Sequence, residues 1–379
     1  MRKKIKIMQI GAENFGYGGR SVIAYNLVKN MPTECFQNDF LALKKRESSK
    51  YIKELNKNGK VIFVYSSKGN RLLQRIAIDY KIIKALNQGK YDIVHIHADN
   101  AYEAMRSVIF SKIAGIRSIV VHAHVSRAKY PMLKNMTIQF CKKLMTYFVD
   151  KKVACTNSAG EFMFGKDVNF EVVNDGIDPD KYKFNYDMRR MVRKEFQWED
   201  KIVVGTVARL SPEKNLSFLI RIFKQIALEK ENIILAIVGD GIEGKKLRNL
   251  CRKLKLDKQV ILLGNRDNVS DILQGFDIFA LPSLREGFGI SILEAQAAGL
   301  DTYVSDLVPL DTKVVPDLYH RLSLKSGGKD WVRSIEEIIK LRSFVKRRDT
   351  SKYISEKGFD IKQSAKQVEK IYLNLKEKN

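Results

Sequence analysis

Residues 202–215 read Ile202-Val-Val-Gly-Thr-Val-Ala-Arg-Leu-Ser-Pro-Glu-Lys-Asn215, and an amphipathic run follows them as far as residue 230. The apolar, β-branched beginning predicts a buried strand, the Ser-Pro-Glu sequence predicts a turn, and the amphipathic run predicts a helix. A buried strand that leads through a short loop into a helix is the repeating unit of a parallel sheet covered by helices. This stretch therefore decides the fold class.

The same alternation of strand and helix continues on both sides of this stretch. Further strands are predicted at residues 233–239, 259–263 and 277–281, and a helix at 244–255. In the N-terminal half, strands are predicted at 5–10, 61–64, 93–97, 118–122 and 152–155, and helices at 71–87 and 130–149. The pattern predicts an α/β protein with two Rossmann-like, doubly wound domains that face a cleft.

The segment Val172-Val-Asn-Asp-Gly-Ile-Asp-Pro179 is rich in turn formers and separates the two halves. We therefore expect an N-terminal domain over residues 1–175 and a C-terminal domain over residues 176–360. Residues 361–379 read as a charged amphipathic helix that crosses back to the N-terminal domain. A chain of 379 residues, 45% of them hydrophobic, has enough apolar material for two cores of this size.

No apolar run reaches the ~20 residues that are needed to cross a bilayer. The N-terminal segment Met1-Arg-Lys-Lys-Ile-Lys-Ile-Met-Gln-Ile10 begins like a signal peptide, but Lys6 interrupts its apolar part. A glycine loop follows, so we interpret the segment as a first strand. Four scattered cysteines without a CxxC pair favour reduced thiols in the cytoplasm over disulfides or zinc.

The chain carries 68 Lys and Arg residues against 43 Asp and Glu residues, a formal net charge of +25. Such a charge attracts nucleic acid, nucleotide phosphates or an anionic membrane surface. The basic residues form no dense stripe and no nucleic-acid module is evident, so we expect no nucleic-acid partner. Residues 127–152 mix basic side chains with aromatic residues and methionines, and they read either as an interfacial helix or as a core helix. A merely lysine-rich surface is a further alternative.

Ligands of open α/β sheets bind at the carboxyl ends of the strands, so loops that follow strands should carry the chemistry. Arg209 ends a predicted buried strand and Lys214 opens the next helix, and two cations so placed can clamp a diphosphate. The alternative is an ion pair between Arg209 and a carboxylate such as Glu294. The glycine loop at residues 11–19 is either a phosphate contact or an ordinary flexible turn.

A further loop, Ser283-Leu-Arg-Glu-Gly-Phe-Gly289, follows a predicted strand and opens a helix of small residues. Backbone N–H groups at residues 287–289 would meet a ligand at the N-terminus of this helix. The carboxylates of Glu286 and Glu294 could accept hydrogen bonds from sugar hydroxyls. A solvated surface charge is the alternative for each of them, although Glu294 lies among Ile, Leu and Ala.

Four of the five histidines form two pairs, His95-Ile-His97 and His122-Ala-His124, each at the end of a predicted strand. A His-x-His pair invites a metal, but no third ligand is evident, so we expect no metal site. A polar lining for an acceptor is the better interpretation, with His97 and His124 emerging at the strand ends. His95 is expected to be buried and hydrogen-bonded.

These motifs, in this order and spacing, resemble the retaining, family-four glycosyltransferases of the two-Rossmann-domain (GT-B) type. The resemblance is greatest to bacterial capsule and exopolysaccharide enzymes of the EpsF/CapM kind, and it runs through nearly the whole chain. The segments that carry it are Tyr-Asp-Ile-Val-His-Ile-His97, Val-His-Ala-His124, Val-Asn-Asp-Gly-Ile-Asp178, Ala-Arg209-Leu-Ser-Pro-Glu-Lys214-Asn, Val-Gly-Asp-Gly241, Leu-Gly-Asn-Arg266 and Glu286-x(7)-Glu294-Ala-Gln-Ala-Ala-Gly299.

The resemblance implies a role for each matched position. It implies catalytic roles for a histidine near the transferred sugar, two cations on the donor diphosphate and a carboxylate on the sugar, namely His124, Arg209, Lys214 and Glu286. It implies donor contacts through the phosphate loop, the base segment, the sugar-binding amides and a ribose-binding carboxylate, namely Gly18, Gly19, Asn265, Arg266, Gly287, Phe288, Gly289 and Glu294. The acceptor side would carry His97 and His122.

The resemblance also implies that a hexosyl group moves from a nucleotide sugar, with uridine as the expected base, to a lipid-linked saccharide in capsule or exopolysaccharide synthesis. Retention of configuration, no metal, no cofactor and a peripheral place on an anionic membrane at its cytosolic face are expected with it. The alternatives are a soluble acceptor, or a sugar-nucleotide enzyme such as a hydrolysing epimerase. Asp178-Pro-Asp180 matches the Asp-x-Asp signature of metal-dependent glycosyltransferases, but it falls between the predicted domains and reads as a turn.

Overall fold

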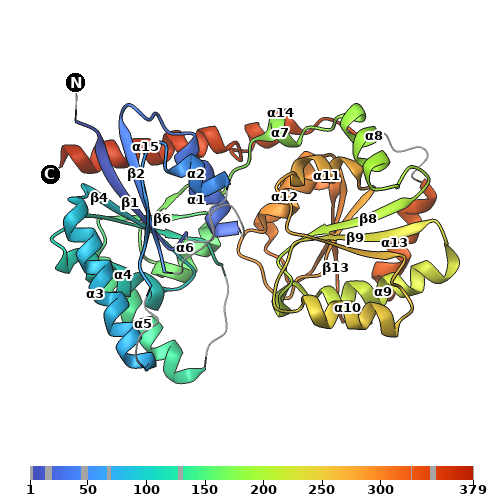
Figure 1. Cartoon of the computed structure of the whole chain (residues 1–379), viewed down its shortest axis with the longest axis horizontal. Coiled ribbons are helices and arrows are strands. Elements are labelled where there is room, and N and C mark those ends of the chain that lie inside the picture. Colours follow the sequence, from blue (N-terminus) through green and yellow to red (C-terminus); the bar gives the residue numbers. More distant parts are fainter. Residues whose placement is uncertain are drawn as a thin grey trace. The chain divides into compact units, whose positions relative to one another are not determined.

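The computed structural model describes residues 3–12, 19–43, 50–65, 70–126, 131–325, 327–341 and 347–378. They fold into two compact units. Unit 1 consists of Met1–Gly176 together with Ile361–Asn379, and unit 2 consists of Ile177–Asp360. In Figure 1, unit 1 runs from blue to green and its last helix is red. The predicted fold class of two doubly wound α/β domains is confirmed, because each unit is built on one parallel sheet.

Unit 1 contains a seven-stranded sheet in the order β3-β2-β1-β4-β5-β6-β7, and its strand pairs are parallel. Its strands are β1 (Ile5–Ile10), β2 (Phe36–Ala42), β3 (Val61–Phe63), β4 (Ile93–Ala98), β5 (Ser118–Ala123), β6 (Lys151–Ala154) and β7 (Glu171–Val172). Its helices are α1 (Gly19–Lys29), α2 (Lys50–Leu55), α3 (Arg71–Gly89), α4 (Ala101–Ile113), α5 (Met132–Phe148), α6 (Asn157–Phe164) and α15 (Ile361–Glu377). The strand order reverses between β1 and β4, where doubly wound sheets bind ligands.

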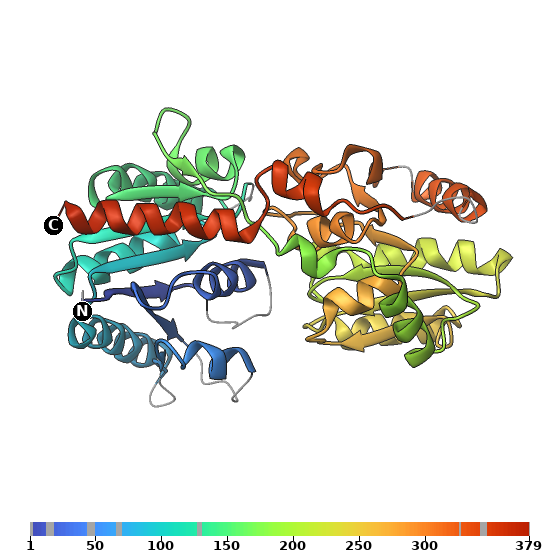
Figure 2. The same cartoon turned by 90° about the horizontal axis from the view of Figure 1, so that it is seen from above.

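Right-handed crossovers divide the helices of unit 1 between the two faces of the sheet. The first group is α1 and α2, and α15 packs beside α1. The second group is α3, α4 and α5, each packed against the next. Figure 2 shows α15 in red running alongside the strands of unit 1. The C-terminal helix is therefore an integral part of this unit.

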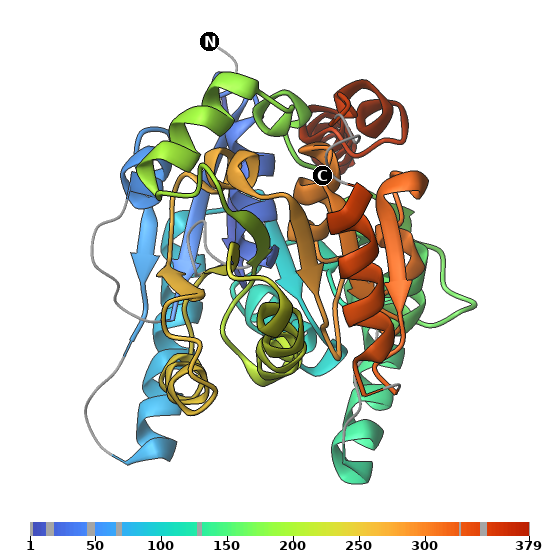
Figure 3. The same ribbon diagram turned by 90° about the vertical axis from the view of Figure 1, so that its right-hand side faces the viewer.

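Unit 2 contains a six-stranded parallel sheet in the order β10-β9-β8-β11-β12-β13. Its strands are β8 (Ile202–Val207), β9 (Ile233–Val238), β10 (Val260–Gly264), β11 (Ile278–Leu281), β12 (Asp301–Ser305) and β13 (Tyr319–Leu322). Its helices are α7 (Pro179–Tyr182), α8 (Tyr186–Glu195), α9 (Leu216–Glu229), α10 (Gly244–Lys253), α11 (Val269–Gly275), α12 (Ile290–Ala297), α13 (Lys329–Leu341) and α14 (Ser351–Glu356), with 3-10 turns η1 (Pro212–Lys214), η2 (Leu310–Thr312) and η3 (Pro316–Leu318). Figure 3 shows helices on both faces of this sheet. The order reverses between β8 and β11.

The strands and helices predicted from the sequence are present, with ends within two residues of the expected ones. Strand β2, next to the edge strand β3, was not predicted, because Asn38 and Asp39 interrupt its apolar pattern. Both side chains are buried and bonded, since Gln9 donates to Asn38 over 2.8 Å and Tyr91 donates to Asp39 over 2.8 Å. Strands β12 and β13 were also not predicted. The turn predicted at Asp178-Pro-Asp180 is instead the start of α7.

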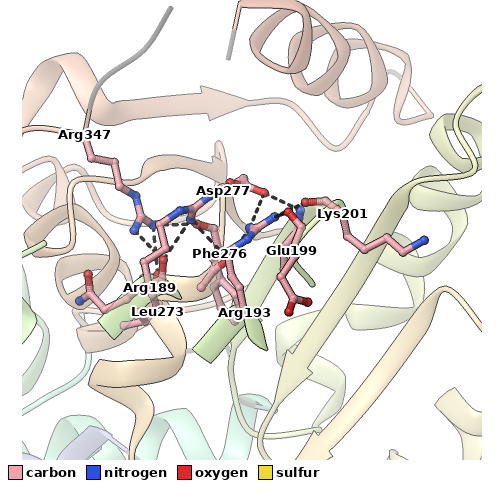
Figure 4. A network of polar contacts seen from close by, with 11 residues as sticks. Arg189, Arg193, Glu199, Lys201, Leu273, Phe276, Asp277 and Arg347 are labelled. Carbon is pink, nitrogen blue, oxygen red and sulfur yellow. Dashed lines mark hydrogen bonds and ion pairs between the residues drawn. The ribbon is translucent and has the colours of Figure 1, made fainter. Parts of the chain in front are cut away.

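Three arginines close the C-terminal end of α11 in unit 2. Arg193 of α8 donates to the Gly275 carbonyl over 2.9 Å and pairs with Asp277 over 3.2 Å. Arg189 pairs with the other oxygen of Asp277 over 2.5 Å, and Arg347 donates to the carbonyls of the same turn. Figure 4 shows these guanidinium groups gathered around the end of the helix. They supply the donors that the last carbonyls of a helix lack, and they join α8 to the sheet.

We predict that Arg193→Ala lowers the free energy of unfolding of unit 2 by about 3 kcal/mol, because it leaves the buried carboxylate of Asp277 with one cation fewer. Both tryptophans, Trp198 and Trp331, are buried in unit 2, so their fluorescence during urea unfolding follows this unit alone.

The matched control is Arg190→Ala on the same helix. Arg190 is exposed and pairs only with the exposed Asp187 among the described residues, so its loss should cost less than about 0.5 kcal/mol. Equal losses for Arg193→Ala and Arg190→Ala would show that the network does not stabilise the unit.

Candidate functional site

A nearly buried ion pair lies at the point where the strand order of unit 2 reverses. Lys214, in the turn after β8, places Nζ 2.6 and 2.7 Å from the two carboxylate oxygens of Glu286, in the loop after β11. The hydroxyl of Ser283 donates to one of these oxygens over 2.7 Å. The side chain of Glu286 is only 5% exposed and that of Lys214 is 18% exposed. The sequence motifs therefore meet as one polar cluster at the carboxyl edge of the sheet.

Arg209, five residues before Lys214, is exposed to solvent, although it was expected to be buried. The prediction that it ends a buried strand is wrong, because β8 ends at Val207 and the side chain of Arg209 is 62% exposed. It pairs with Glu213 over 2.8 Å, four residues along the chain, and not with Glu294. Burial raises the pKa of Glu213, but hydrogen bonds from Ser211 and Arg209 outweigh this effect and lower it. The guanidinium is thus accessible to an anion from solvent.

Glu294 lies on α12 and is buried. The hydroxyl of Tyr182, on α7, donates to its Oε1 over 2.7 Å. Burial raises the pKa of Glu294 to about 7, and the Tyr182 hydrogen bond and the Lys181 charge limit the rise. Glu294 therefore changes its charge near neutral pH. Sequence reasoning missed Tyr182, which carries no motif of its own.

The loop between Glu286 and α12 can meet a ligand mainly through its backbone. The ring of Phe288 is buried and stacks on Phe359, with ring centroids 5.2 Å apart. Gly289 precedes α12 with a φ of +81°, a conformation that side chains disfavour. Gly287 lies between Glu286 and Phe288 and is partly exposed. The amides of this loop are therefore the groups placed at the helix N-terminus.

The segment expected to contact a base follows β10. Asn265 and Arg266 are both exposed. The guanidinium of Arg266 lies 5.7 Å from the ring centre of Phe196, and its Nε donates to the Leu263 carbonyl over 3.1 Å. The two residues are accessible, and their contact with a base stays a prediction.

The glycine loop of unit 1 is described only in part. Gly18 lies outside the described residues, and Gly19 begins α1. Gly11 has a φ of +86°, and a Cβ atom there would lie 2.0 Å from the His97 carbonyl oxygen. Glycine at position 11 is therefore required by the close approach of β1 and β4, whatever the loop binds.

The two histidine pairs form one stack at the switch point of unit 1. Residues two apart on a strand face the same side, and His97 pairs in register with His122 on the next strand. Ring centroids are 4.3 Å apart within each pair and 5.4 Å apart between His95 and His122. All four residues are at most 5% exposed. His97, His122 and His124 thus lie under the surface, and a direct ligand contact by any of them stays a prediction that requires a side-chain movement.

Other buried polar groups surround the stack. His97 Nδ1 lies 3.0 Å from His124 Nε2, and His124 Nδ1 lies 3.3 Å from a carboxylate oxygen of Asp175. The hydroxyl of Tyr372, on α15, lies 2.6 Å from His95 Nδ1. His122 lies near the Val173 carbonyl but lacks the geometry of a hydrogen bond to it. Sequence reasoning missed Asp175 and Tyr372, because neither belongs to a His-containing motif.

Burial keeps most of the stack neutral. It lowers the pKa of His95 to about 3, and it lowers the pKa values of His97 and His122 well below the ordinary value for histidine. Positive charge on neighbouring histidine rings lowers each of these pKa values further. One ring at most can therefore hold a second proton near neutral pH.

The stack also contains two groups of possible metal ligands within the described residues, His95, His97 and His122, and His122, His124 and Asp175, with ligand atoms within 4.8 Å. A ring nitrogen binds a metal along its lone pair, in the plane of the ring. Neighbouring rings are nearly parallel, at 9° for His95 and His122 and 30° for His97 and His122. Stacked rings point few lone pairs toward one another, and the expectation that the protein needs no metal stays a prediction.

Comparison with known proteins gives one family and several relatives. Residues 188–358 match the family model described as glycosyl transferases group 1. EpsF of Bacillus subtilis (strain 168), to which glycosyltransferase activity is ascribed, is 25% identical over 365 residues, which cover 94% of this chain and 93% of EpsF. A UDP-Gal:alpha-D-GlcNAc-diphosphoundecaprenol alpha-1,3-galactosyltransferase of Escherichia coli is 29% identical over 239 residues, which cover 60% of each chain.

A solved structure shares the fold of the whole chain. The crystal structure of HepE from Anabaena in complex with UDP-glucose has a TM-score of 0.78 at 18% identity, and the match covers 98% of this chain and 100% of HepE. At this identity the likeness bears on the fold alone. The matched segment 188–358 contains Arg209, Lys214, Glu286 and Glu294, which form the polar edge of unit 2. Together with the similarity to EpsF along nearly the full length of the chain, this match confirms the resemblance to glycosyltransferases.

Proposed function

We propose that this glycosyltransferase moves a hexosyl group from a UDP-linked sugar to a lipid-linked saccharide, with retention of configuration and without a metal. The observation that carries the proposal is the cluster of Lys214, Glu286 and Ser283 beside the accessible guanidinium of Arg209. A relative whose name gives UDP-Gal as donor and a diphosphoundecaprenol-linked sugar as acceptor supports the two substrates.

The cluster offers cations to a diphosphate and acceptors to a sugar. An ammonium group has three N–H donors, and Glu286 takes two of those of Lys214, which leaves one for a phosphate oxygen. Arg209 presents a guanidinium fork that suits a diphosphate. The carboxylate of Glu286 keeps lone pairs for sugar hydroxyls, because its other contacts are the fixed bonds from Lys214 and Ser283.

In this mechanism the protein supplies positive charge that stabilises the negative charge on the departing diphosphate. Arg209, Lys214 and the amides before α12 would stabilise the leaving group electrostatically. The acceptor hydroxyl would attack from the side of the leaving group and pass its proton to a phosphate oxygen. None of these steps asks for a carboxylate base, so Glu286 holds the sugar in place.

We predict that Arg209→Ala and Lys214→Ala each lower kcat/KM for glycosyl transfer by about 10²–10³-fold, the loss expected for one preorganised charge on the leaving group. A radiolabelled sugar donor and a lipid-linked acceptor measure this rate. Chelation with EDTA should leave the wild-type rate unchanged.

The control is Arg333→Ala, which removes an equally exposed arginine of unit 2 that pairs with Asp330 on α13. It should keep the wild-type rate. Full activity in Arg209→Ala, or complete loss of activity in EDTA, contradicts the proposed mechanism.

Glu294 is proposed to hold the ribose, and its charge makes that role dependent on pH. A carboxylate accepts hydrogen bonds from two ribose hydroxyls, whereas the protonated group accepts them less well. Because the pKa of Glu294 is raised to about 7, the ionised form is scarce at pH 6 and dominant at pH 8. Binding should therefore strengthen as the pH rises through this range.

We predict that the Kd for UDP-glucose falls by about tenfold between pH 6 and pH 8, in proportion to the ionised fraction of Glu294. The diphosphate of a nucleotide sugar does not titrate here, so calorimetry reports the protein. Glu294→Gln should bind equally at both pH values, and Glu337→Gln, an exposed change on α13, should keep the wild-type dependence. A pH-independent wild type would refute the ribose role.

The acceptor half of the proposal rests on the neighbouring helices α3, α4 and α5 of unit 1. The part of α5 at residues 132–137 is wholly exposed, and Figure 1 shows it projecting past the sheet. The three helices expose large apolar side chains, which we call the apolar helix face: Leu72, Leu73, Ile76, Tyr80, Tyr102, Ile109, Ile113, Met132, Leu133, Met136, Phe140, Tyr147 and Phe148. Large apolar side chains exposed on three neighbouring helices are typical of a binding surface.

We propose an anionic bilayer as the partner of the apolar helix face. Basic residues are interspersed on the same helices, including Arg75, Lys84, Lys134 and Lys143, and the chain as a whole carries +25. Apolar side chains with basic neighbours are typical of helices that lie in a membrane interface. Among the described residues, no helix is both long enough and apolar enough to cross a bilayer. Residues 127–130, part of the expected interfacial segment, lie outside the described residues.

A cavity adjoins this face and suits the head of a lipid-linked acceptor. It lies at the carboxyl ends of β1 and β4, between α3 and α4, and its lining includes Arg75, Tyr102, Arg106 and His97. Arg75 donates to the Tyr102 hydroxyl over 3.1 Å. Arg106 pairs with Asp79, and Glu103 also lines the cavity, so the Arg75 guanidinium is the group that could meet an acceptor phosphate beside exposed apolar side chains. His97 lies at the inner end of this cavity and is 1% exposed, so its contact with an acceptor still needs a side-chain movement.

We predict that the double variant Leu133→Ser/Phe140→Ser binds vesicles of phosphatidylglycerol and phosphatidylcholine at least about tenfold more weakly than the wild type, because two exposed apolar anchors are lost. Flotation through a density gradient measures the bound fraction. The control Leu228→Ser/Leu341→Ser removes two exposed leucines of unit 2 and should float like the wild type. Equal flotation of all three proteins, or equal binding to neutral vesicles, contradicts the bilayer assignment.

A further inference from the structure

We propose that His124 is held as a doubly protonated imidazolium, and that Asp175, Gln9 and Asn38 are positioning residues that fix this state. The inference rests on the proposed function for the role of His124 in transfer, but the protonation state itself follows from unit 1 alone. It is carried by a chain of buried hydrogen bonds in which each residue determines what the next can donate.

The chain starts at a sulfur atom. The amide nitrogen of Asn38 lies 4.0 Å from the thioether of Met31, and a thioether can accept a hydrogen bond but cannot donate one. The Asn38 amide therefore turns its N–H₂ group toward Met31 and its carbonyl oxygen toward Gln9. This oxygen lies 2.8 Å from Gln9 Nε2, which must donate. The orientation of the Gln9 amide is thereby fixed.

The next link is His97. Gln9 Oε1 lies 3.0 Å from His97 Nε2, and because a carbonyl oxygen only accepts, this ring nitrogen carries the proton. Burial and the charge of neighbouring groups, Arg20 of α1 among them, lower the pKa of His97 well below its ordinary value. His97 is therefore neutral, and its Nδ1 offers a lone pair.

That lone pair and Asp175 together protonate His124 on both sides. His97 Nδ1 lies 3.0 Å from His124 Nε2, which must donate to it. His124 Nδ1 lies 3.3 and 3.4 Å from the two oxygens of the Asp175 carboxylate, which accepts. Asp175 is buried, and a buried carboxylate needs a positive partner. An imidazolium at His124 satisfies both contacts and balances the charge.

A second branch from Gln9 agrees with this assignment. The remaining N–H of Gln9 Nε2 points to the Tyr372 hydroxyl over 3.1 Å, so the hydroxyl accepts there and donates its own proton to His95 Nδ1 over 2.6 Å. His95 is then neutral with its proton on Nε2, a buried N–H that has no hydrogen-bond partner among the described residues. The C-terminal helix thus completes the network, and His95, His97 and His122 face His124 as neutral rings.

The assignment defines what His124 can do in the reaction. An imidazolium has no lone pair, so it can donate a hydrogen bond and stabilise negative charge but cannot act as a base. Its Nε2–H rests on His97, and a movement of the ring would free this N–H to bond an oxygen atom of a substrate. In this account, His97 Nδ1 accepts the hydrogen bond from His124 Nε2–H when no substrate is bound.

The test observes the protons directly. In protein labelled with ¹⁵N-histidine, spectra at pH 7 should show two protonated nitrogens for the ring whose signals disappear in His124→Asn. Asp175→Asn keeps an acceptor in the same place but removes the charge, so one of the two protons should be lost. The control Asp150→Asn, the same change next to β5 at Ile119, should leave the His124 signals unchanged.

A wild-type ring with a single proton, on Nδ1, would overturn the inference. It would mean that the Gln9 amide is turned round and that the whole chain donates in the opposite direction. This result needs no variant, so it decides the question even where Asp175→Asn fails to fold.

Activity connects the protonation state to the reaction. Asp175→Asn should lower kcat for transfer by about tenfold or more, the loss expected when one charge-assisted hydrogen bond is weakened, while Asp150→Asn keeps the wild-type kcat. If a doubly protonated His124 is found but no nucleotide sugar is used, the proposed function fails and the protonation state stands. If Asp175→Asn loses the proton but keeps full kcat, the role given to the imidazolium is wrong.

Discussion

In a parallel sheet every strand ends at the same edge. In each unit, this constraint brings polar residues that are far apart in the sequence to one place. Lys214 and Glu286 are 72 residues apart in the sequence, yet they form an ion pair because β8 and β11 are neighbours at the switch point of unit 2. His97 and His124 meet in unit 1 because β4 and β5 pair in register. Since the loops after these strands need little structure of their own, changes in them can alter chemistry without altering the fold.

The two units use this edge in different ways. In unit 2 Arg209 is exposed and Lys214 is mostly buried with one donor left for a ligand, so an anion can reach the first cation directly from solvent. In unit 1 the polar groups are buried, and their protons are determined by one another. The bonded groups of this network constrain one another, although four of its buried atoms, His95 Nε2, His122 Nδ1 and Nε2 and Asp175 Oδ1, have no hydrogen-bond partner among the described residues. The cations of unit 2 are therefore suited to binding an anionic ligand. The histidine network of unit 1 is suited to holding a proton at one defined nitrogen atom.

The sequence predicted where the site residues follow strands, because apolar runs and turn formers define strand ends locally. It did not predict their partners. Tyr182 meets Glu294 from a short helix without a motif, and Tyr372 meets Gln9 across 363 residues, so both contacts depend on the finished fold. Arg209 was predicted to end a buried strand. Its side chain is exposed instead, because β8 ends two residues earlier, at Val207. β2 was missed because its polar residues find buried partners that a sequence pattern does not reveal.

The central claim is retaining transfer of a hexosyl group by protein cations. It is tested most directly by incubating the enzyme with a UDP-α-sugar and a lipid-linked acceptor in EDTA and determining the anomeric configuration of the new linkage by NMR. The account predicts an α-linked product that forms only when the acceptor is present. A β-linked product, or free sugar released without transfer, would contradict it.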